Sequence, residues 1–187
     1  MRVAADALRA SLAGGALVML AIGRTHAAVA LALVGIGALV LRAARPPVRL
    51  DLLFVVLLCA DAWATSLGAF EQFNREDRPG HLLLSALATP IVFHLVHRSG
   101  AVRAAPRASV GGRLGFFIAV AGLGMGLGVA WELLEYGADA ILGTNMSLGY
   151  GDTMGDLVAD AVGVSTAAAL LTWSRGRRPP PVTAGRA

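Results

Sequence analysis

Six apolar runs, several of which approach the length that crosses a lipid bilayer, constrain this chain more than any other feature. They cover residues 4–22, 27–41, 50–70, 81–97, 114–138 and 153–173. A membrane-crossing helix needs about 20 mostly apolar residues, since it must satisfy its backbone hydrogen bonds internally. The chain has 187 residues, of which 56% are hydrophobic, and its mean hydropathy is +0.67. The sequence therefore predicts an all-α fold, a polytopic transmembrane helix bundle with about six spans.

Polar, Gly-rich or Pro-rich segments separate the runs. Pro46 and Pro47 lie in the basic linker 42–49 and stop helices there. A Gly-rich turn region covers residues 143–152 before the last run. The C-terminal residues are basic and Pro-rich, a composition typical of disorder. We predict one transmembrane helical domain over residues 1–174 and a disordered, basic, Pro-rich cytoplasmic tail over 175–187.

The distribution of arginine predicts the orientation, and the chain has no lysine. With six crossings, the side that holds both termini carries thirteen arginines: Arg2, Arg9, Arg42, Arg45, Arg49, Arg98, Arg103, Arg107, Arg113, Arg175, Arg177, Arg178 and Arg186. The other side carries only Arg24, Arg75 and Arg78. Because cytoplasmic loops collect positive charge, we expect both termini in the cytoplasm. The expected location is the bacterial cytoplasmic (inner) membrane, with multiple spans.

The first run has two interpretations. Arg2 and Arg9 come before most of its apolar residues and an Ala-rich stretch near residues 27–28 follows it, as in a secretory signal peptide. We favour a retained first helix, because its arginines belong to the charge pattern. Cleavage would leave five spans in the same orientation.

Acidic residues gather on the side opposite the arginines. Nine fall in the outer loops or in the outer halves of spans: Glu71, Glu76, Asp77, Glu132, Glu135, Asp139, Asp152, Asp156 and Asp160. An unpaired carboxylate at membrane depth must be protonated, paired or bound to a metal. This distribution predicts a cation-binding or proton-holding pocket that opens to the extracytoplasmic side. Asp61, near the middle of the third run, either joins this pocket from below or hydrogen-bonds to a neighbour.

Three aspartates recur every four residues at the start of the last run, in Gly-Asp-Thr-Met-Gly-Asp-Leu-Val-Ala-Asp. In a helix, Asp152, Asp156 and Asp160 share one face. Asp152 and Asp156 also suit the cap and first turn of a helix, so capping is an alternative explanation for both. Asp160 lies about 12 Å deeper than Asp152 along the helix, and capping cannot explain it.

Glu132 and Glu135 share a helix face near the outer end of the fifth run. Across a tight hairpin from the aspartates, they complete an oxygen-rich site of the kind that suits Mg²⁺, Mn²⁺ or Ca²⁺. The candidate metal ligands are Glu132, Glu135, Asp152, Asp156 and Asp160. The alternative is that both glutamates extend to the membrane surface.

A Pro-Gly turn signal lies between Arg78 and His81, at the start of the fourth run. Asp77 and His81 are the candidate catalytic residues, with His81 as a general acid/base or proton relay. Arg78 is the candidate substrate-binding residue, because its guanidinium can hold an anion such as phosphate. The alternatives are an interfacial histidine and a solvated loop arginine. His94 and His97 lie about 20 Å away along the helix, so we expect them to be interfacial.

Four glycines, Gly122, Gly124, Gly126 and Gly128, alternate inside the fifth run. No strand precedes them, so the pattern favours close helix packing over nucleotide binding. Their spacing gives two small-residue faces that could also support a homo-oligomer. Membrane lipid is the other expected partner, and no basic patch with interleaved aromatics indicates nucleic acid. The single Cys59 leaves no disulfide within the chain and no thiolate metal site.

Three motifs follow one another along the chain: Asp77-Arg-x-Gly-His81, Trp131-Glu-x-x-Glu135, and Gly151-Asp-Thr-Met-Gly-Asp-x-x-x-Asp160. In this order they resemble the YjdF-like bacterial inner-membrane proteins and, more distantly, VanZ-like membrane proteins. The resemblance covers about residues 51–173. It implies a small helical membrane protein with polar residues clustered near one membrane face. The resemblance implies no particular biochemical activity. The family often has a bulky residue, commonly Trp, where this chain has Gly155, which changes local packing but not the acids.

We consider three functions. The leading hypothesis is a divalent-metal-dependent hydrolase or transferase that acts on a lipid or lipid-linked phosphate at the outer leaflet. The second is a cation- or proton-coupled transporter in which Asp61 and Asp160 extend the ion path inward. The third is a non-catalytic accessory membrane protein whose acids only cap helices and hydrogen-bond. The sequence has no Ser or Cys nucleophile motif and no inverted repeat.

Overall fold

The computed structural model describes residues 1–68, 77–101, 110–144, 146 and 149–176. Within these ranges every regular element is an α-helix. The helices are α1 (Arg2–Ala21), α2 (Thr25–Ala43), α3 (Val48–Ser66), α5 (Arg78–Arg98), α6 (Val110–Leu142) and α7 (Tyr150–Gly176). The predicted all-α bundle is confirmed, and each predicted run forms the body of one helix.

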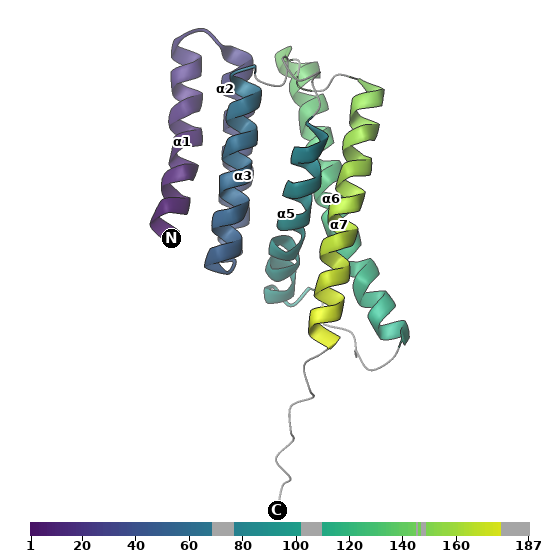
Figure 1. The fold of residues 1–187 in the computed structure, drawn as a ribbon. Coiled ribbons are helices and arrows are strands. Elements are labelled where there is room, and N and C mark those ends of the chain that lie inside the picture. Colours follow the sequence, from purple (N-terminus) through teal and green to yellow (C-terminus); the bar gives the residue numbers. More distant parts are fainter. Residues whose placement is uncertain (69–76, 102–109, 145, 147–148, 177–187) are drawn as a thin grey trace, which may run out of the picture.

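Five of these helices are long and apolar enough to cross a membrane: α1, α2, α5, α6 and α7. The sixth described helix, α3, has 19 residues but carries Arg49, Asp51 and Asp61. It packs against α1 and α2 and runs alongside them (Figure 1). The described helices alternate in direction, so the first and last described residues lie at the same end of the bundle (Figure 1). The chain is therefore a multi-pass helical membrane bundle with α3 packed among the spans.

Turn chemistry sets several helix ends. Gly23, in the tight turn between α1 and α2, has a φ of 77°, which L side chains rarely adopt. Pro47 precedes α3, where its missing N–H breaks no helical hydrogen bond. The sequence predicts a third span that reaches residue 70, whereas α3 ends at Ser66 because Gly68 takes a φ of 76°. Residues 69 and 70 lie outside the described ranges.

The last two helices are longer than the sequence predicts. α6 has 33 residues, so it is about 50 Å long and exceeds a hydrocarbon core of about 30 Å. α7 has 27 residues and continues past the predicted domain boundary at residue 174. The rest of the predicted tail, residues 177–187, lies outside the described part of the chain.

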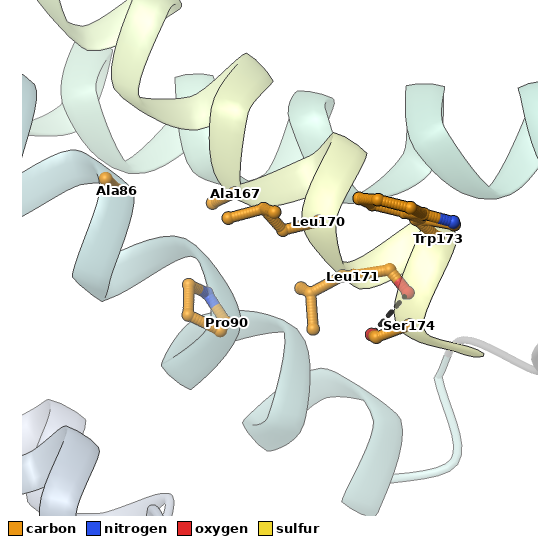
Figure 2. Close-up of a pocket in the computed structure, with 7 residues that line it drawn as sticks. All are labelled: Ala86, Pro90, Ala167, Leu170, Leu171, Trp173 and Ser174. Atoms are coloured by element: carbon orange, nitrogen blue, oxygen red, sulfur yellow. Dashed lines mark hydrogen bonds between the residues drawn. The ribbon is translucent and has the colours of Figure 1, made fainter. Parts of the chain in front are cut away.

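An apolar groove lies between α5 and α7, toward the end at which α7 finishes (Figure 2). Pro90, inside α5, lines this groove and lacks the N–H that would close a helical hydrogen bond. The other lining residues are Ala86, Ala167, Leu170, Leu171, Trp173 and Ser174. None of these residues is titratable, so the groove lies apart from the acidic side chains.

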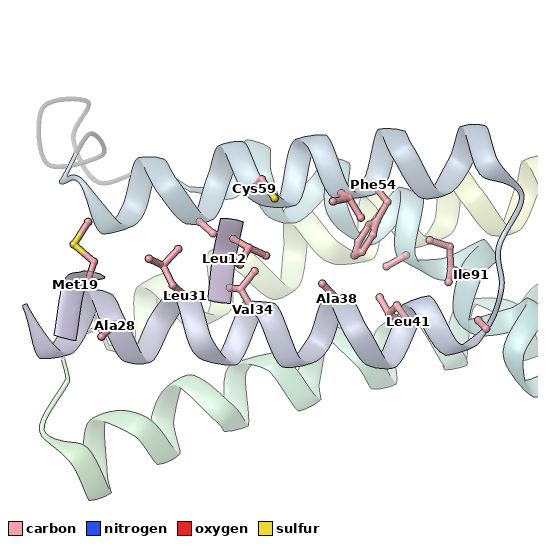
Figure 3. Packing of buried hydrophobic residues seen from close by; sticks show 14 residues of the cluster. Leu12, Met19, Ala28, Leu31, Val34, Ala38, Leu41, Phe54, Cys59 and Ile91 are labelled. Atoms are coloured by element: carbon pink, nitrogen blue, oxygen red, sulfur yellow. The ribbon is translucent and has the colours of Figure 1, made fainter. Parts of the chain in front are cut away.

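The largest buried core lies between α1, α2, α3 and the facing side of α5 (Figure 3). Leu12, Leu31 and Ile91, from three of these helices, are fully buried within it. Gly15 of α1 lets the indole ring of Trp63 approach, since a Cβ at that position would overlap the ring. This packing ties the first three helices to α5, the helix on which the candidate site begins.

A buried ion pair lies at the end of the bundle where α1 begins. Arg9 of α1 pairs with Asp51 of α3, and its Nε donates to the carbonyl of Ala38 in α2 at 3.3 Å. Asp6 accepts from Arg9 at 3.2 Å and from Arg42 at 2.9 Å. We call the end that holds Arg9 and Arg42 the arginine end. The pair therefore joins α1 to α3 at this end of the bundle.

We expect Asp51→Asn or Arg9→Met alone to lower the free energy of unfolding by about 3–5 kcal/mol, because each leaves a buried charge unpaired. The double variant Arg9→Met/Asp51→Leu, which removes both charges, is expected to recover most of that loss. Thermal unfolding of detergent-purified protein measures both effects, with Arg49→Ala on the exposed side of α3 as the control. Single variants that unfold at the wild-type temperature would contradict the role of this pair.

Candidate metal centre at the acidic end

Three helices meet at the end of the bundle opposite the arginine end. α6 finishes there, whereas α5 and α7 start there (Figure 1). Asp77 immediately precedes α5 and His81 follows one turn later, while Glu132 lies on α6. Asp156 lies nearly two turns into α7. We call the end that holds these four residues the acidic end. Because neighbouring helices are antiparallel, the start of one and the finish of another lie at the same level.

Asp77, His81 and Asp156 converge on one point. Each offers one ligand atom to a group in which all the atoms lie within 4.8 Å of one another. The sequence predicts Asp156 as a metal ligand and Asp77 and His81 as catalytic residues, and the structure brings all three into a single group. Three protein ligands at this spacing suit one divalent ion that keeps a position open for water or substrate.

The imidazole of His81 faces carboxylates from three elements. Its Nδ1 lies 3.4 Å from Oδ1 of Asp160 on α7 and 3.9 Å from Oε1 of Glu132 on α6. Its Nε2 lies 4.0 Å from Oδ2 of Asp77. The His81 side chain is 12% exposed and that of Asp160 is 4% exposed. Capping does not explain Asp160, and the partner that its carboxylate has at this depth is the His81 imidazole.

Three buried carboxylate oxygens at this end have no hydrogen-bond partner within the described residues. They are Oδ1 of Asp77, Oε1 of Glu132 and Oδ1 of Asp156. Asp156 as a whole is 1% exposed. A buried, unsatisfied carboxylate oxygen is costly, so a bound cation or a shared proton is needed to balance it. A donor set of carboxylate oxygens with one imidazole fits a divalent metal ion.

Small residues make these close approaches sterically feasible. A Cβ on Gly128 of α6 would overlap the Asp160 carboxylate, and a Cβ on Gly80 of α5 would overlap the Asp61 carboxylate. Asp61 therefore reaches the acidic end from α3 and lies against the first turn of α5. Of the two alternatives that the sequence leaves open for Asp61, the structure favours a place at the acidic end.

Arg78 lies beside the converging ligands. Its side chain is exposed in the first turn of α5, and its guanidinium rests where a Cβ on Gly155 of α7 would be. Gly155 directly precedes Asp156, so the guanidinium lies against the turn of α7 that carries this candidate ligand. A bulky residue at position 155 would displace Arg78 from this position. An exposed guanidinium here can hold an anion through paired N–H groups.

The other predicted ligands surround this group. Asp160 lies one turn deeper than Asp156 and is 3% exposed. Glu135 is buried one turn beyond Glu132, toward the end of α6. Asp152 lies in the first turn of α7, where a carboxylate is stabilised by the helix dipole. Stabilisation of a helix end therefore suits Asp152, whereas Asp156 lies too far into α7 for a capping role.

Two further polar residues have separate roles. Asp139, counted among the outer acids, accepts from the Thr144 hydroxyl at 2.5 Å and from the Met146 N–H at 2.8 Å. It thereby stabilises the connection that follows α6. His97 is exposed at the far end of α5 and stacks on Phe93, with ring centroids 5.8 Å apart. It cannot share the site with His81.

Sequence reasoning missed a polar stripe on α5. Ser85 and Thr89 follow His81 at four-residue intervals, so the three share one helix face. The Ser85 hydroxyl has two acceptors for its one proton, the carbonyl of Leu82 at 3.2 Å and the carbonyl of Asp160 at 3.4 Å. Thr89, which is fully buried, donates to the carbonyl of Ser85 at 2.7 Å. The four-residue spacing is the signal that predicts this stripe, although single hydroxyls are common in membrane helices.

The two glycine faces of α6 have different surroundings. A Cβ on Gly124 would overlap the Thr89 hydroxyl, and Gly128 lies against Asp160, so this face packs within the chain. Gly122 and Gly126 have nothing within 4 Å of an added Cβ. A homo-oligomer that uses the second face stays a prediction.

Gly128→Ala is expected to reduce stability by about 1–3 kcal/mol, because the new methyl group must displace the buried Asp160 carboxylate. Gly126→Ala is the matched control, two residues away on the open face, and is expected to be neutral or slightly stabilising. Thermal unfolding of the purified variants in one detergent measures both. Equal unfolding temperatures for the two variants would rule out the close contact between α6 and Asp160.

Comparison with protein-family models matches residues 7–177 to a family described as "Predicted membrane protein (DUF2238)". This match is wider than the stretch that carries the YjdF-like and VanZ-like resemblance, and it does not establish either of those names. Comparisons with curated proteins and with solved structures give no match. Since the family model covers more than half of the chain, the protein belongs to the DUF2238 family of predicted membrane proteins.

Proposed function

We propose that this membrane protein binds a divalent cation at its acidic end and acts as a hydrolase or transferase on a lipid or lipid-linked phosphate. Mg²⁺, Mn²⁺ and Ca²⁺ are the candidate ions. The observation that carries the proposal is the convergence of Asp77, His81 and Asp156 within 4.8 Å. Both aspartates have a buried oxygen without a hydrogen-bond partner among the described residues, which supports a missing positive charge at this point.

The candidate ligands differ in their exposure to solvent. Asp156 is buried and would hold the ion from below, whereas the Asp77 side chain is 32% exposed and borders the solvent. His81 lies between them and contributes a ring nitrogen. Glu132 and Asp160 keep the imidazole in place and add negative charge around it. A divalent cation bound there would polarise a phosphoryl oxygen.

Arg78 supports a phosphate-bearing substrate. Its exposed guanidinium lies against Gly155, directly beside the candidate ligand Asp156. A divalent cation and a neighbouring guanidinium are the two groups that most often bind a phosphate together. The site lies at the ends of membrane-spanning helices, the level at which lipid phosphates lie. These features favour a lipid or lipid-linked phosphate over a small soluble substrate.

The cellular setting and the finer family name belong to the same proposal. The arginine distribution supports a bacterial inner-membrane protein whose acidic end faces away from the cytoplasm. The order of the three sequence motifs supports a YjdF-like protein with a more distant VanZ-like relationship.

A second candidate function is a cation- or proton-coupled transporter. The polar stripe of His81, Ser85 and Thr89 favours it, because these residues lead from the acidic end into the bundle. Asp160 extends the stripe on the facing helix through the hydrogen bond from Ser85. Ion or proton flux in proteoliposomes, abolished by Asp61→Asn or Asp160→Asn, would support transport over catalysis.

Detergent-purified protein is expected to bind about one divalent ion per chain, measured by elemental analysis after dialysis against Mg²⁺, Mn²⁺ or Ca²⁺. Asp156→Asn is expected to lose this ion, because it removes the most buried anionic ligand. Asp6→Asn, at the arginine end, is the control and is expected to retain it. Metal-free wild-type protein under all three conditions, with thermal stability unaffected by EDTA, would overturn the proposal and favour an accessory role.

Release of inorganic phosphate, or transfer of the phosphoryl group, is expected when phosphatidic acid or a polyprenyl diphosphate is supplied in mixed micelles. EDTA is expected to stop the reaction. Arg78→Ala is expected to raise KM roughly tenfold or more while metal binding persists, since it removes a charge-assisted contact to the phosphate. Arg24→Ala, another arginine on the same side of the membrane by the charge pattern, serves as the control. An unchanged KM would exclude Arg78 from substrate binding.

A further inference from the structure

The two ring nitrogens of His81 face different partners. Nδ1 is directed toward the buried carboxylate of Asp160, at 3.4 Å, with Glu132 farther away at 3.9 Å. Nε2 is on the side of Asp77, at 4.0 Å from its carboxylate, and Asp77 belongs to the group of converging ligand atoms. A neutral imidazole has an N–H on only one of its two ring nitrogens. The group that accepts a hydrogen bond from this N–H therefore decides which nitrogen is free to bind a metal.

Asp160 is fixed on the deep side of this ring. It lies one turn beyond Asp156 on α7 and is 3% exposed. Its carboxylate lies against Gly128 of α6, which has no side chain to displace it. The Ser85 hydroxyl lies 3.4 Å from its backbone carbonyl, so α5 and α7 are in contact at this level. Contacts from α6 and α5 therefore keep Asp160 in position to accept a hydrogen bond from Nδ1 of His81.

Asp156 gives independent evidence that a ligand binds next to His81. Its side chain is almost wholly buried, and its Oδ1 has no hydrogen-bond partner within the described residues. This oxygen belongs to a residue whose carboxylate converges with His81 and Asp77. The group of converging side chains therefore contains an unsatisfied buried acceptor within reach of His81.

We propose that Asp160 is a positioning residue and not a metal ligand. It accepts the Nδ1–H of His81 and so leaves Nε2 to bind the ion together with Asp77 and Asp156. The resulting ligand set has one nitrogen and two carboxylates, and it binds Mn²⁺ or Zn²⁺ in preference to Mg²⁺ or Ca²⁺, because imidazole is a poor ligand for the latter two ions. This inference rests on the cation site of the proposed function; among the ions proposed there it favours Mn²⁺, and it adds Zn²⁺ as a candidate.

Competition titration of the chelator-treated full-length protein in detergent tests the choice of metal. Mn²⁺ and Zn²⁺ are expected to bind at least about tenfold more tightly than Mg²⁺ and Ca²⁺. Pulsed electron paramagnetic resonance of the Mn²⁺-loaded protein is expected to detect coupling to one nitrogen. This coupling changes when histidine is labelled with ¹⁵N and disappears in His81→Gln. Mg²⁺ affinity equal to that of Mn²⁺, or no nitrogen coupling in the wild type, would overturn the inference.

The Asp160 variants test the positioning role. Asp160→Asn is expected to weaken Mn²⁺ binding about 10–100-fold while the nitrogen coupling persists, as for other carboxylates behind metal-bound histidines. Asp160→Glu, which restores the acceptor, is expected to recover part of the affinity. Glu132→Gln, at the longer distance from Nδ1, serves as the comparison and is expected to have a smaller effect. Unchanged Mn²⁺ affinity in Asp160→Asn would remove Asp160 from this role.

The outcomes separate this inference from the function on which it rests. If no divalent ion binds the wild type, the proposed function fails as well. If Mg²⁺ or Ca²⁺ binds through Asp77 and Asp156 without nitrogen coupling, only the roles of His81 and Asp160 are wrong. Wild-type measurements decide both cases, so a variant that fails to fold does not block the test.

Discussion

A charged side chain inside an apolar helix bundle must have a partner, and the two ends of this molecule meet that requirement differently. At the arginine end, Arg9 and Asp51 are both buried and neutralise each other across α1 and α3. At the acidic end, His81 stands among several carboxylates and cannot balance them all. The first arrangement is complete within the chain. The second needs protons or a cation, which is why we place function there.

Glycine decides how closely these groups approach. Membrane helices lack a strong hydrophobic drive to associate, so close backbone contact at small residues contributes much of their packing. Here the same contacts shape the site, since Gly128 accommodates Asp160 and Gly155 accommodates Arg78. The acidic end therefore combines a deep part, in which Asp160 is buried, with a part near the surface, in which Arg78 is exposed. Such a division suits a site that holds an ion from inside and admits a phosphate from the membrane surface.

Much of the fold could be predicted from the sequence, and the details of the site could not. The approximate positions of the described helices follow from apolar run length. The third helix ends earlier than its hydrophobicity suggests because Gly68 takes a positive φ. The set of acidic residues at one end follows from spacing and alternating direction. Which of them converge does not, and Asp77 and His81 join Asp156 in one group although sequence spacing assigned them a different role.

The sequence by itself determined a multi-pass helical membrane protein with arginines at one end and carboxylates at the other. Those properties depend on composition, run length and residue spacing, which are local. Only the tertiary structure decided that Arg9 pairs with Asp51, that His81 lies between Asp160 and Asp77, and that Arg78 lies over Gly155. These contacts depend on how each helix is rotated about its axis and how closely neighbouring helices approach. Rotation and approach are set by packing between residues far apart in the chain, so no local pattern reveals them.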